Sequence, residues 1–122
     1  MFTLLVGSCN KIIKWTGKNN YYHYHWFPDP RLTEAEQASY INDRIAAHSL
    51  QRANRGMNIA TNSSLVFNTL RVGIVQERIL HSDVRVLFFD SVVADPLDFD
   101  PIEMPIDKNG RMQSWPKGFF DG

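Results

Sequence analysis

This sequence has very little cysteine, and it lacks an excess of charge of either sign and long hydrophobic runs. The 122 residues include a single cysteine, Cys9, so neither an internal disulfide nor a zinc site built from several thiolates can form. The 13 basic side chains are matched by 13 acidic ones, which argues against nucleic-acid binding driven by bulk charge. The apolar run that opens the chain is too short to cross a bilayer and lacks the basic leader of a signal peptide. We therefore expect a cytoplasmic protein, with no membrane partner, that folds by packing alone.

Three catalytic signatures are also missing. The sequence has no G-x-x-x-x-G-K-[ST] loop to wrap nucleotide phosphates and no Gly-x-Ser-x-Gly elbow to expose a nucleophile. An acidic stretch that could suggest a magnesium-dependent nuclease is interrupted by prolines and has no Glu-x-Lys partner, so a solvated loop is the better interpretation. Its members are Asp90, Asp95, Asp98, Asp100 and Glu103. The sequence thus predicts no catalytic residue, no resident metal and no cofactor.

The composition that is present is that of a globular domain, with 43% hydrophobic and 21% charged residues. The length suits a single domain, 1–122, with one compact core. Its three consecutive parts are 1–55 (a strand, an aromatic segment and a first helix), 56–90 (strand, helix, strand) and 91–122 (a hairpin and an aromatic tail).

The first part begins with a strand that should be buried on both faces, because Phe2–Val6 is a continuous run of β-forming apolar residues. Lys11–Trp15 is ambiguous, and Thr16–Asn20 predicts a turn. The aromatic run Tyr21–Phe27 predicts an edge strand, which Pro28 ends by removing a ladder donor.

A first helix should begin at Thr33, because Thr33 and Glu36 have the spacing of a capping box. Its apolar stripe repeats at helical spacing, and Gly56 should end it in the left-handed conformation. The stripe consists of Ala38, Ile41, Ile45 and His48.

The second part predicts a strand at Met57–Thr61, caps at Asn62–Ser64, and a helix with Val66, Phe67, Leu70, Ile74 and Val75 on its buried side. Val84–Phe89 predicts another buried strand. Apolar strands that alternate with helices indicate a parallel sheet. A hairpin from about Ile102 to Gln113, turning at Asp107–Arg111, should follow. The expected fold class is α/β: a small, mainly parallel sheet with two flanking helices and a C-terminal edge hairpin.

Two aromatic clusters are the candidate interface, because Tyr and Trp supply large contact areas with a polar tip. They contain Tyr21, Tyr22, Tyr24, Trp26, Trp115, Phe119 and Phe120. His23 and His25 would point the same way on a strand and could bind a metal with Asp29, but an aromatic surface explains them better. Stacking of single-stranded nucleic acid is a further alternative, which the few nearby cations disfavour.

Four features share an order with a known family. They are Ile59-Ala60-Thr61-Asn62-Ser63, Leu87-Phe88-Phe89-Asp90, the turn Asp107–Arg111, and Trp115-Pro116-Lys117-Gly118-Phe119-Phe120-Asp121. This order resembles the C-terminal part of ABC-type ATPase heads related to the RecF, SMC and OLD proteins, where a Thr-His-Ser switch, a Phe-Phe-acid strand end, a hairpin and a Trp-Pro-x-Gly-Phe-Phe-Asp tail follow one another. A weaker extension puts Phe2–Gly7 on the Walker B strand and Phe27–Ala53 on the segment and helix after it.

The departures from this family concern its catalytic elements. The phosphate loop is missing, Leu4–Ser8 carries no Walker B carboxylate, and Asn62 stands where the resemblance implies the switch histidine. Asparagine can donate a hydrogen bond but cannot take up a proton near neutral pH. Since phosphoryl transfer depends on electrostatic clamping, the resemblance implies a scaffold that does not hydrolyse nucleotide by itself.

These features together predict a non-catalytic protein-binding module, which acts as partner, decoy or inhibitor of another protein. That partner could be an intact ATPase of this kind, and a phage or mobile-element origin would suit such a module. Two alternatives remain open. The chain could be one lobe of a split ATPase that is completed by another polypeptide, or a structural subunit that forms a homo-oligomer.

Overall fold

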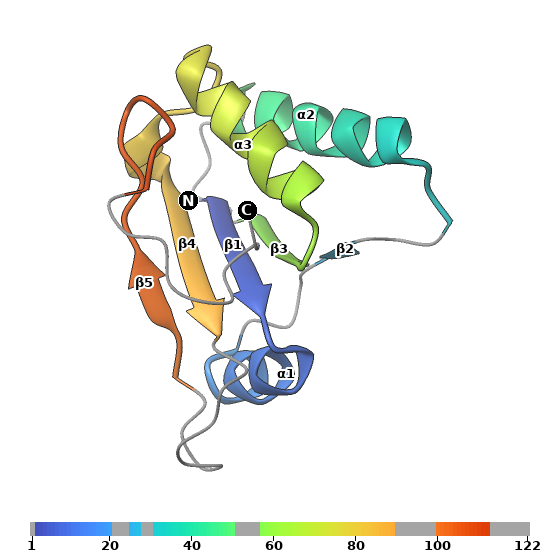
Figure 1. The fold of residues 1–122 in the computed structure, drawn as a ribbon, viewed down its shortest axis with the longest axis vertical. Helices are drawn as coiled ribbons and strands as arrows, with labels where there is room; N and C mark the ends of the chain where they lie inside the picture. Colours follow the sequence, from blue (N-terminus) through green and yellow to red (C-terminus); the bar gives the residue numbers. More distant parts are fainter. Residues whose placement is uncertain (1, 21–24, 28–30, 51–56, 90–99, 113–122) are drawn as a thin grey trace.

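A five-stranded sheet forms the centre of the protein (Figure 1). The computed structural model describes residues 2–20, 25–27, 31–50, 57–89 and 100–112, and only the backbone of 25–27, 48–50 and 57. The strand order is β2-β3-β1-β4-β5. The strands are β1 (Phe2–Gly7), β2 (His25–Phe27), β3 (Met57–Thr61), β4 (Val84–Phe89) and β5 (Ile102–Met104). The first four pair in parallel and β5 pairs antiparallel with β4, which confirms the predicted α/β class with a mainly parallel sheet.

The central strand β1 is buried on both faces, as its continuous apolar run predicts. Leu4 packs in the larger of two hydrophobic clusters, whereas its neighbour Leu5 packs in the smaller one. Successive side chains of a strand point to opposite faces, so each cluster fills one side of the sheet.

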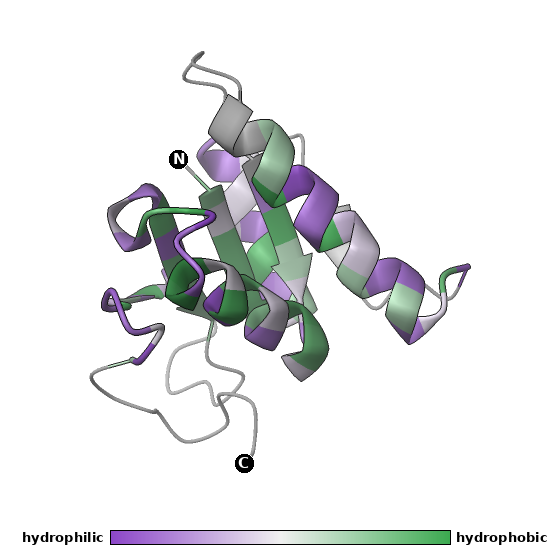
Figure 2. Ribbon diagram, turned by 90° about the horizontal axis from the view of Figure 1, so that it is seen from above, coloured by the Kyte–Doolittle hydropathy of each residue, from purple (hydrophilic) through white to green (hydrophobic). Residues whose placement is uncertain are grey.

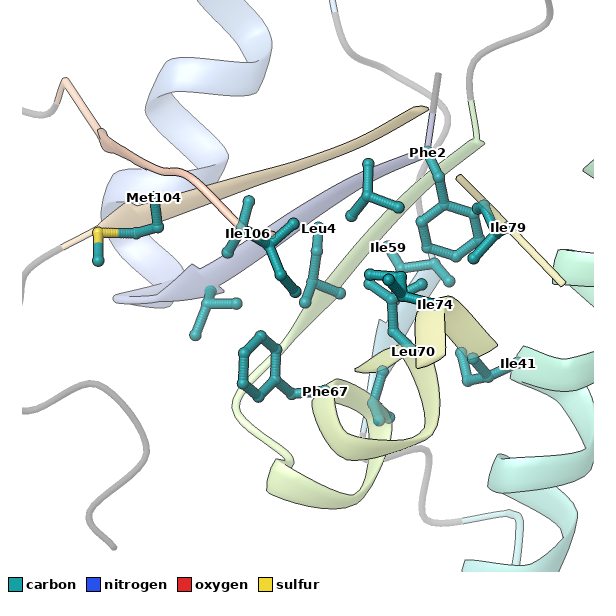
Figure 3. Packing of buried hydrophobic residues seen from close by; sticks show 14 of the residues in the cluster. Phe2, Leu4, Ile41, Ile59, Phe67, Leu70, Ile74, Ile79, Met104 and Ile106 are labelled. Atoms are coloured by element: carbon teal, nitrogen blue, oxygen red, sulfur yellow. The ribbon is translucent and has the colours of Figure 1, made fainter. Parts of the chain in front are cut away.

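Helices cover both faces of the sheet. The smaller cluster joins Leu5, Leu87 and Phe89 to Ile12 and Trp15 of helix α1 (Cys9–Lys18). The larger cluster joins the opposite side of the strands to α2 (Glu34–Leu50) and α3 (Ser64–Val75). Figure 3 shows the larger cluster, with side chains of α3 pointing toward those of the strands.

Helix α1 corrects two expectations from the sequence, because it occupies the ambiguous segment and the first three residues of the predicted turn. Ile12, Trp15 and Thr16 are buried on one face, and Trp15 packs edge-on against Phe89 with ring centroids 5.6 Å apart. Burial of this face overrides the weak helix propensity of Gly17. The turn begins only at Asn19, and Asn20 has a φ of 62°. Among the described residues, three helices therefore flank the sheet, not two.

The predicted capping box at the start of α2 is present. The Glu36 N–H donates to Thr33 Oγ1 at 3.2 Å, and the Thr33 N–H donates to Glu36 Oε1 at 3.1 Å. Ile41 and Ile45 are fully buried, as the apolar stripe predicts. Figure 2 shows the strands largely green and α2 largely purple and pale, as expected for a helix with one buried stripe. Gly56, the predicted end of this helix, lies outside the described residues.

Helix α3 begins where the sequence predicts, but two details differ. Ser63 occupies the N-cap position without making a side-chain capping bond, and its backbone N–H donates to Thr61 Oγ1 at 2.8 Å. Val66, Phe67, Leu70 and Ile74 are buried as expected. Val75, which was assigned to the buried side, is 59% exposed.

The predicted C-terminal hairpin is present in the described residues. Ile102–Met104 pairs with β4, and the turn is closed by a bridge between Ile106 and Met112. Pro101 and Pro105 flank β5 and have no N–H to donate, which keeps this edge strand short. Gln113 lies beyond the described part of the chain. None of the described helices is both long and apolar enough to cross a membrane.

Gly7 fixes the distance between the ends of β1 and β4. Its φ is +119°, and a Cβ atom at this position would lie 2.1 Å from the carbonyl oxygen of Phe89. Only glycine fits such an approach, because the obstacle is backbone and cannot rotate away.

We predict opposite effects for two glycine-to-alanine substitutions. Gly7→Ala should lower the free energy of unfolding by about 2–4 kcal/mol, since it combines a disfavoured φ with a backbone clash. Gly17→Ala has no atom within 4 Å of the new Cβ and lies inside α1, so it should raise stability by about 0.5–1 kcal/mol. Urea unfolding followed by circular dichroism measures both, and equal effects of the two substitutions would contradict this account.

Candidate functional site

The carboxyl ends of β1 and β3 form the position where an open parallel sheet would hold a ligand. These strands are neighbours, but α1 after β1 covers one face of the sheet and α3 after β3 covers the other. Where connections leave in opposite directions, the loops separate and leave a crevice, which is the usual ligand site of such sheets. Gly7, Ser8, Asn62 and Ser63 lie at this edge.

This edge is bridged by the protein's own hydrogen bonds. The Gly7 N–H donates to Asn62 Oδ1 at 3.2 Å, which joins the end of β1 to the end of β3. The Ser8 N–H donates to the Phe89 carbonyl oxygen at 2.9 Å, which joins β1 to β4. Two backbone amides that could otherwise approach a phosphate group therefore have partners within the sheet.

The charged groups at this edge favour an anion over a metal. The first turn of α1 and the first turn of α3 contain no acidic residue. Lys11 is the third residue of α1. The N-terminal ends of helices carry partial positive charge, so the edge is weakly positive. Within the part of the chain that the structure describes, no group of three or more His, Cys, Asp or Glu side chains could hold a metal ion. Asp90, which follows β4 in the sequence, lies outside that part.

A second feature, the hairpin turn, is fixed against α3 (Figure 1). Gly110 has a φ of +70°, and a Cβ there would be 3.0 Å from the Arg71 carbonyl oxygen and 3.2 Å from Val75 Cγ2. The Arg71 Nε donates to the Gly110 carbonyl oxygen at 2.6 Å. The turn and the helix are thus joined by one side-chain hydrogen bond and by close packing that requires glycine.

The Asp107 carboxylate organises this turn. Its Oδ1 accepts the Asn109 N–H at 2.8 Å and the Arg111 N–H at 2.9 Å. The Arg111 N–H bond is the largest cause that holds the pKa of Asp107 below its ordinary value of 3.8. Partial burial opposes this shift, while the Asn109 N–H and the charges of Arg111 and His81 add to it.

The residues of the predicted interface lie almost entirely outside the described part of the chain. This holds for Tyr21, Tyr22, Tyr24, Trp115, Phe119, Phe120 and His23. The backbone of His25 and Trp26 forms β2, the outermost strand beside β3. The interface and the metal pair therefore stay predictions.

Three further residues that the sequence singles out, Glu103, His81 and Cys9, lie in the described part of the chain. Glu103 from the acidic stretch pairs with Arg85 at 3.0 Å, and both side chains are partly exposed, so the pair contributes little to stability. The His81 Nδ1 lies 3.2 Å from the Ile106 carbonyl oxygen. Cys9 is exposed at the first position of α1.

An exposed apolar pair on α3 was missed by the sequence analysis. Val72 and Val75 are 47% and 59% exposed, and they line a groove beside the hairpin turn. The sequence of α3 contains a signal for this pair. Its apolar residues occupy more of the helix circumference than a single buried face, so some of them must lie at the surface.

The comparison with protein families gives one match. A family described as a protein of unknown function (DUF3696) matches residues 79–122, fewer than half of the chain. The matched residues include the 3₁₀ turn His81–Asp83, β4, β5 and the hairpin turn. No curated protein and no solved structure matches the chain.

We predict that acid weakens the hairpin turn through Asp107. A carboxyl whose pKa is lowered by folding stabilises the folded state above its unfolded pKa, and this contribution is lost as the pH falls through the folded value. The wild-type protein should therefore lose stability relative to Asp107→Asn between about pH 5 and about pH 2, because the amide keeps an acceptor oxygen but does not titrate. Urea unfolding of both proteins across this range is the measurement. Parallel pH profiles would show that Asp107 has no such role.

Proposed function

We propose that this chain is a non-catalytic protein-binding module built on a scaffold like that of an ABC-type ATPase head. The observation that carries the proposal is the bridged edge of the sheet. Where a ligand would bind, Asn62 accepts the Gly7 N–H, and neither a carboxylate nor an imidazole of the described residues lies at the ends of β1 and β3. A site without a general base or a magnesium ligand is poorly suited to phosphoryl transfer.

The β1–α1 connection gives further support. A phosphate-binding loop needs several residues between strand and helix, so that successive backbone amides surround the anion. Here only Ser8 separates Gly7, the last residue of β1, from Cys9, the first residue of α1. Gly7 also lies so close to the Phe89 carbonyl oxygen that no Cβ atom fits between them.

The likeness to an ATPase head rests on the resemblance in the sequence. The family model of unknown function matches residues 79–122, which include three of these features of the sequence: the Phe-Phe-acid strand end, the hairpin turn and the aromatic tail. In the weaker extension of the resemblance, the segment and helix at Phe27–Ala53 follow the Walker B strand at Phe2–Gly7. The structure differs from this order, because α1 and β2 lie between β1 and α2. The partner of such a module is a protein, and an intact ATPase of this kind is the candidate that the resemblance favours.

A second candidate, one lobe of a split ATPase, is supported by the weak positive character of the same edge. Lys11 and the N-terminal ends of α1 and α3 would favour an anion supplied with another polypeptide. If a partner ATPase is found, turnover by the mixture decides between these functions. Hydrolysis that depends on this chain favours the split enzyme, whereas unchanged or inhibited hydrolysis favours the binding module.

One prediction of the proposed function concerns ATP hydrolysis. The purified chain should release no phosphate from ATP and magnesium above the blank rate, and Asn62→His, which restores the histidine of the resembling family, should release none either. One imidazole does not replace the missing phosphate loop and metal ligands. A malachite-green phosphate assay measures this, with an intact ATPase as positive control. Magnesium-dependent release that a single substitution abolishes would refute the non-catalytic function.

Another prediction of the proposed function concerns the aromatic interface. Trp115→Ala and Phe119→Ala should each reduce capture of a specific partner on the immobilised chain at least about tenfold, as expected for aromatic residues at the centre of an interface. Lys18→Ala, at the exposed C-terminal end of α1, is the matched control and should leave capture unchanged. Quantitative mass spectrometry of the captured proteins gives the ratio, and equal capture by all variants would remove these residues from the interface.

A further inference from the structure

A groove of about 330 Å³ lies between the outer face of α3 and the hairpin turn. Val72 and Val75 form its apolar part and are about half exposed. Asn68, Gln76 and Asn109 place exposed side-chain amides around it. An apolar strip surrounded by hydrogen-bonding groups is the usual composition of a peptide-binding groove.

The groove is held in shape by the protein itself. The Arg71 Nε donates to the Gly110 carbonyl oxygen at 2.6 Å, and the turn packs closely against Val75. Asp107 fixes the other side of the turn by accepting two backbone N–H groups. A preformed groove loses little conformational freedom when a ligand binds, which favours affinity.

The charges around the groove have mainly one sign. Arg71 lines it, and Lys108 and Arg111 flank its two residues from the turn. Helix α3 contains no acidic residue, and the carboxylate of Asp107 is already engaged by backbone amides. The charge of Arg111 also acts on this carboxylate, since it is one of the causes that lower the pKa of Asp107. Glu77 follows Gln76 of the lining, so three cations stand beside two carboxylates, of which Asp107 is engaged, and the surface is weakly basic on a chain whose net charge is zero.

We propose that this groove binds an acidic amphipathic segment of another protein. This inference rests on the proposed protein-binding function and adds to the aromatic clusters a second surface with its own ligand class. Apolar side chains of the segment pack on Val72 and Val75, and its carboxylates face Arg71 and Arg111. Helical segments bind grooves in this way, through apolar anchors at helical spacing with complementary charges beside them.

Two other occupants fit the groove less well. A second copy that met this surface across a two-fold axis would bring its cations against the same cations, which costs free energy. Single-stranded nucleic acid binds by stacking its bases on aromatic side chains. The described lining of this groove consists of valine, glycine, asparagine, glutamine and arginine residues.

The experiment measures binding of a defined probe to the full chain by fluorescence anisotropy. The probe is a labelled synthetic peptide of about twelve residues with Leu and Glu at helical spacing, and the matched probe replaces every Glu by Lys. The test variants are Val75→Glu and Arg111→Glu. The control variants are Ile13→Glu and Lys14→Glu, because both residues are exposed on α1, on the opposite face of the sheet. All substituted side chains are exposed, and thermal unfolding verifies that each variant is folded.

The Leu/Glu peptide should bind the wild-type chain and both control variants with equal affinity. Val75→Glu and Arg111→Glu should each weaken it at least about tenfold, since each removes a favourable contact and adds a repelling charge. Equal binding of the Leu/Lys peptide, equal loss in the control variants, or no binding of the Leu/Glu peptide would overturn the proposal. Displacement of the peptide by a poly-dT oligonucleotide would also overturn the proposal. Displacement by self-association of the chain, seen in light scattering, would do the same. The proposed function fails by a different result, nucleotide hydrolysis by the chain alone, so the two failures are distinguishable.

Discussion

The close approach of Gly7 to the Phe89 carbonyl oxygen is the constraint on which the rest of the structure depends. It sets the spacing between the central strand β1 and β4 at the point where both strands end. It also requires a sharp turn into α1, because the next N–H, that of Ser8, donates to the same carbonyl oxygen. The start of α1, the packing of Trp15 against Phe89 and the hydrogen bond from Gly7 to Asn62 all lie next to this contact.

The same contact limits what the edge of the sheet can do. A parallel sheet normally binds ligands outside the carboxyl ends of its strands, where loops separate. In this protein the separation is present, but the strand ends are connected to one another by hydrogen bonds. The positive ends of α1 and α3 and the Lys11 side chain are the features described at this edge that favour an anion. A binding function therefore depends on other surfaces of the molecule.

The groove beside α3 is one of these surfaces, and it depends on the hairpin turn. Asp107 gives the turn its shape, Gly110 allows it to approach the helix, and Arg71 holds it there. The turn lies within residues 79–122, which match one family model, whereas α3 lies before that range. The groove is thus formed from one segment inside the matched family and one outside it.

The sequence by itself determined the α/β class, the strands β1, β3 and β4, the capping box of α2 and the position of the hairpin turn. Each of these depends on local signals: apolar runs, the Thr33–Glu36 spacing and the turn residues Asp107–Gly110. Tertiary structure decided the rest. Helix α1 forms because Ile12 and Trp15 reach an apolar face of the sheet, and this burial outweighs the turn-forming tendency of Gly17. The sequence likewise could not place Val75 at the surface or bring Arg71 to Gly110, because contacts between residues far apart in the chain depend on how the layers pack.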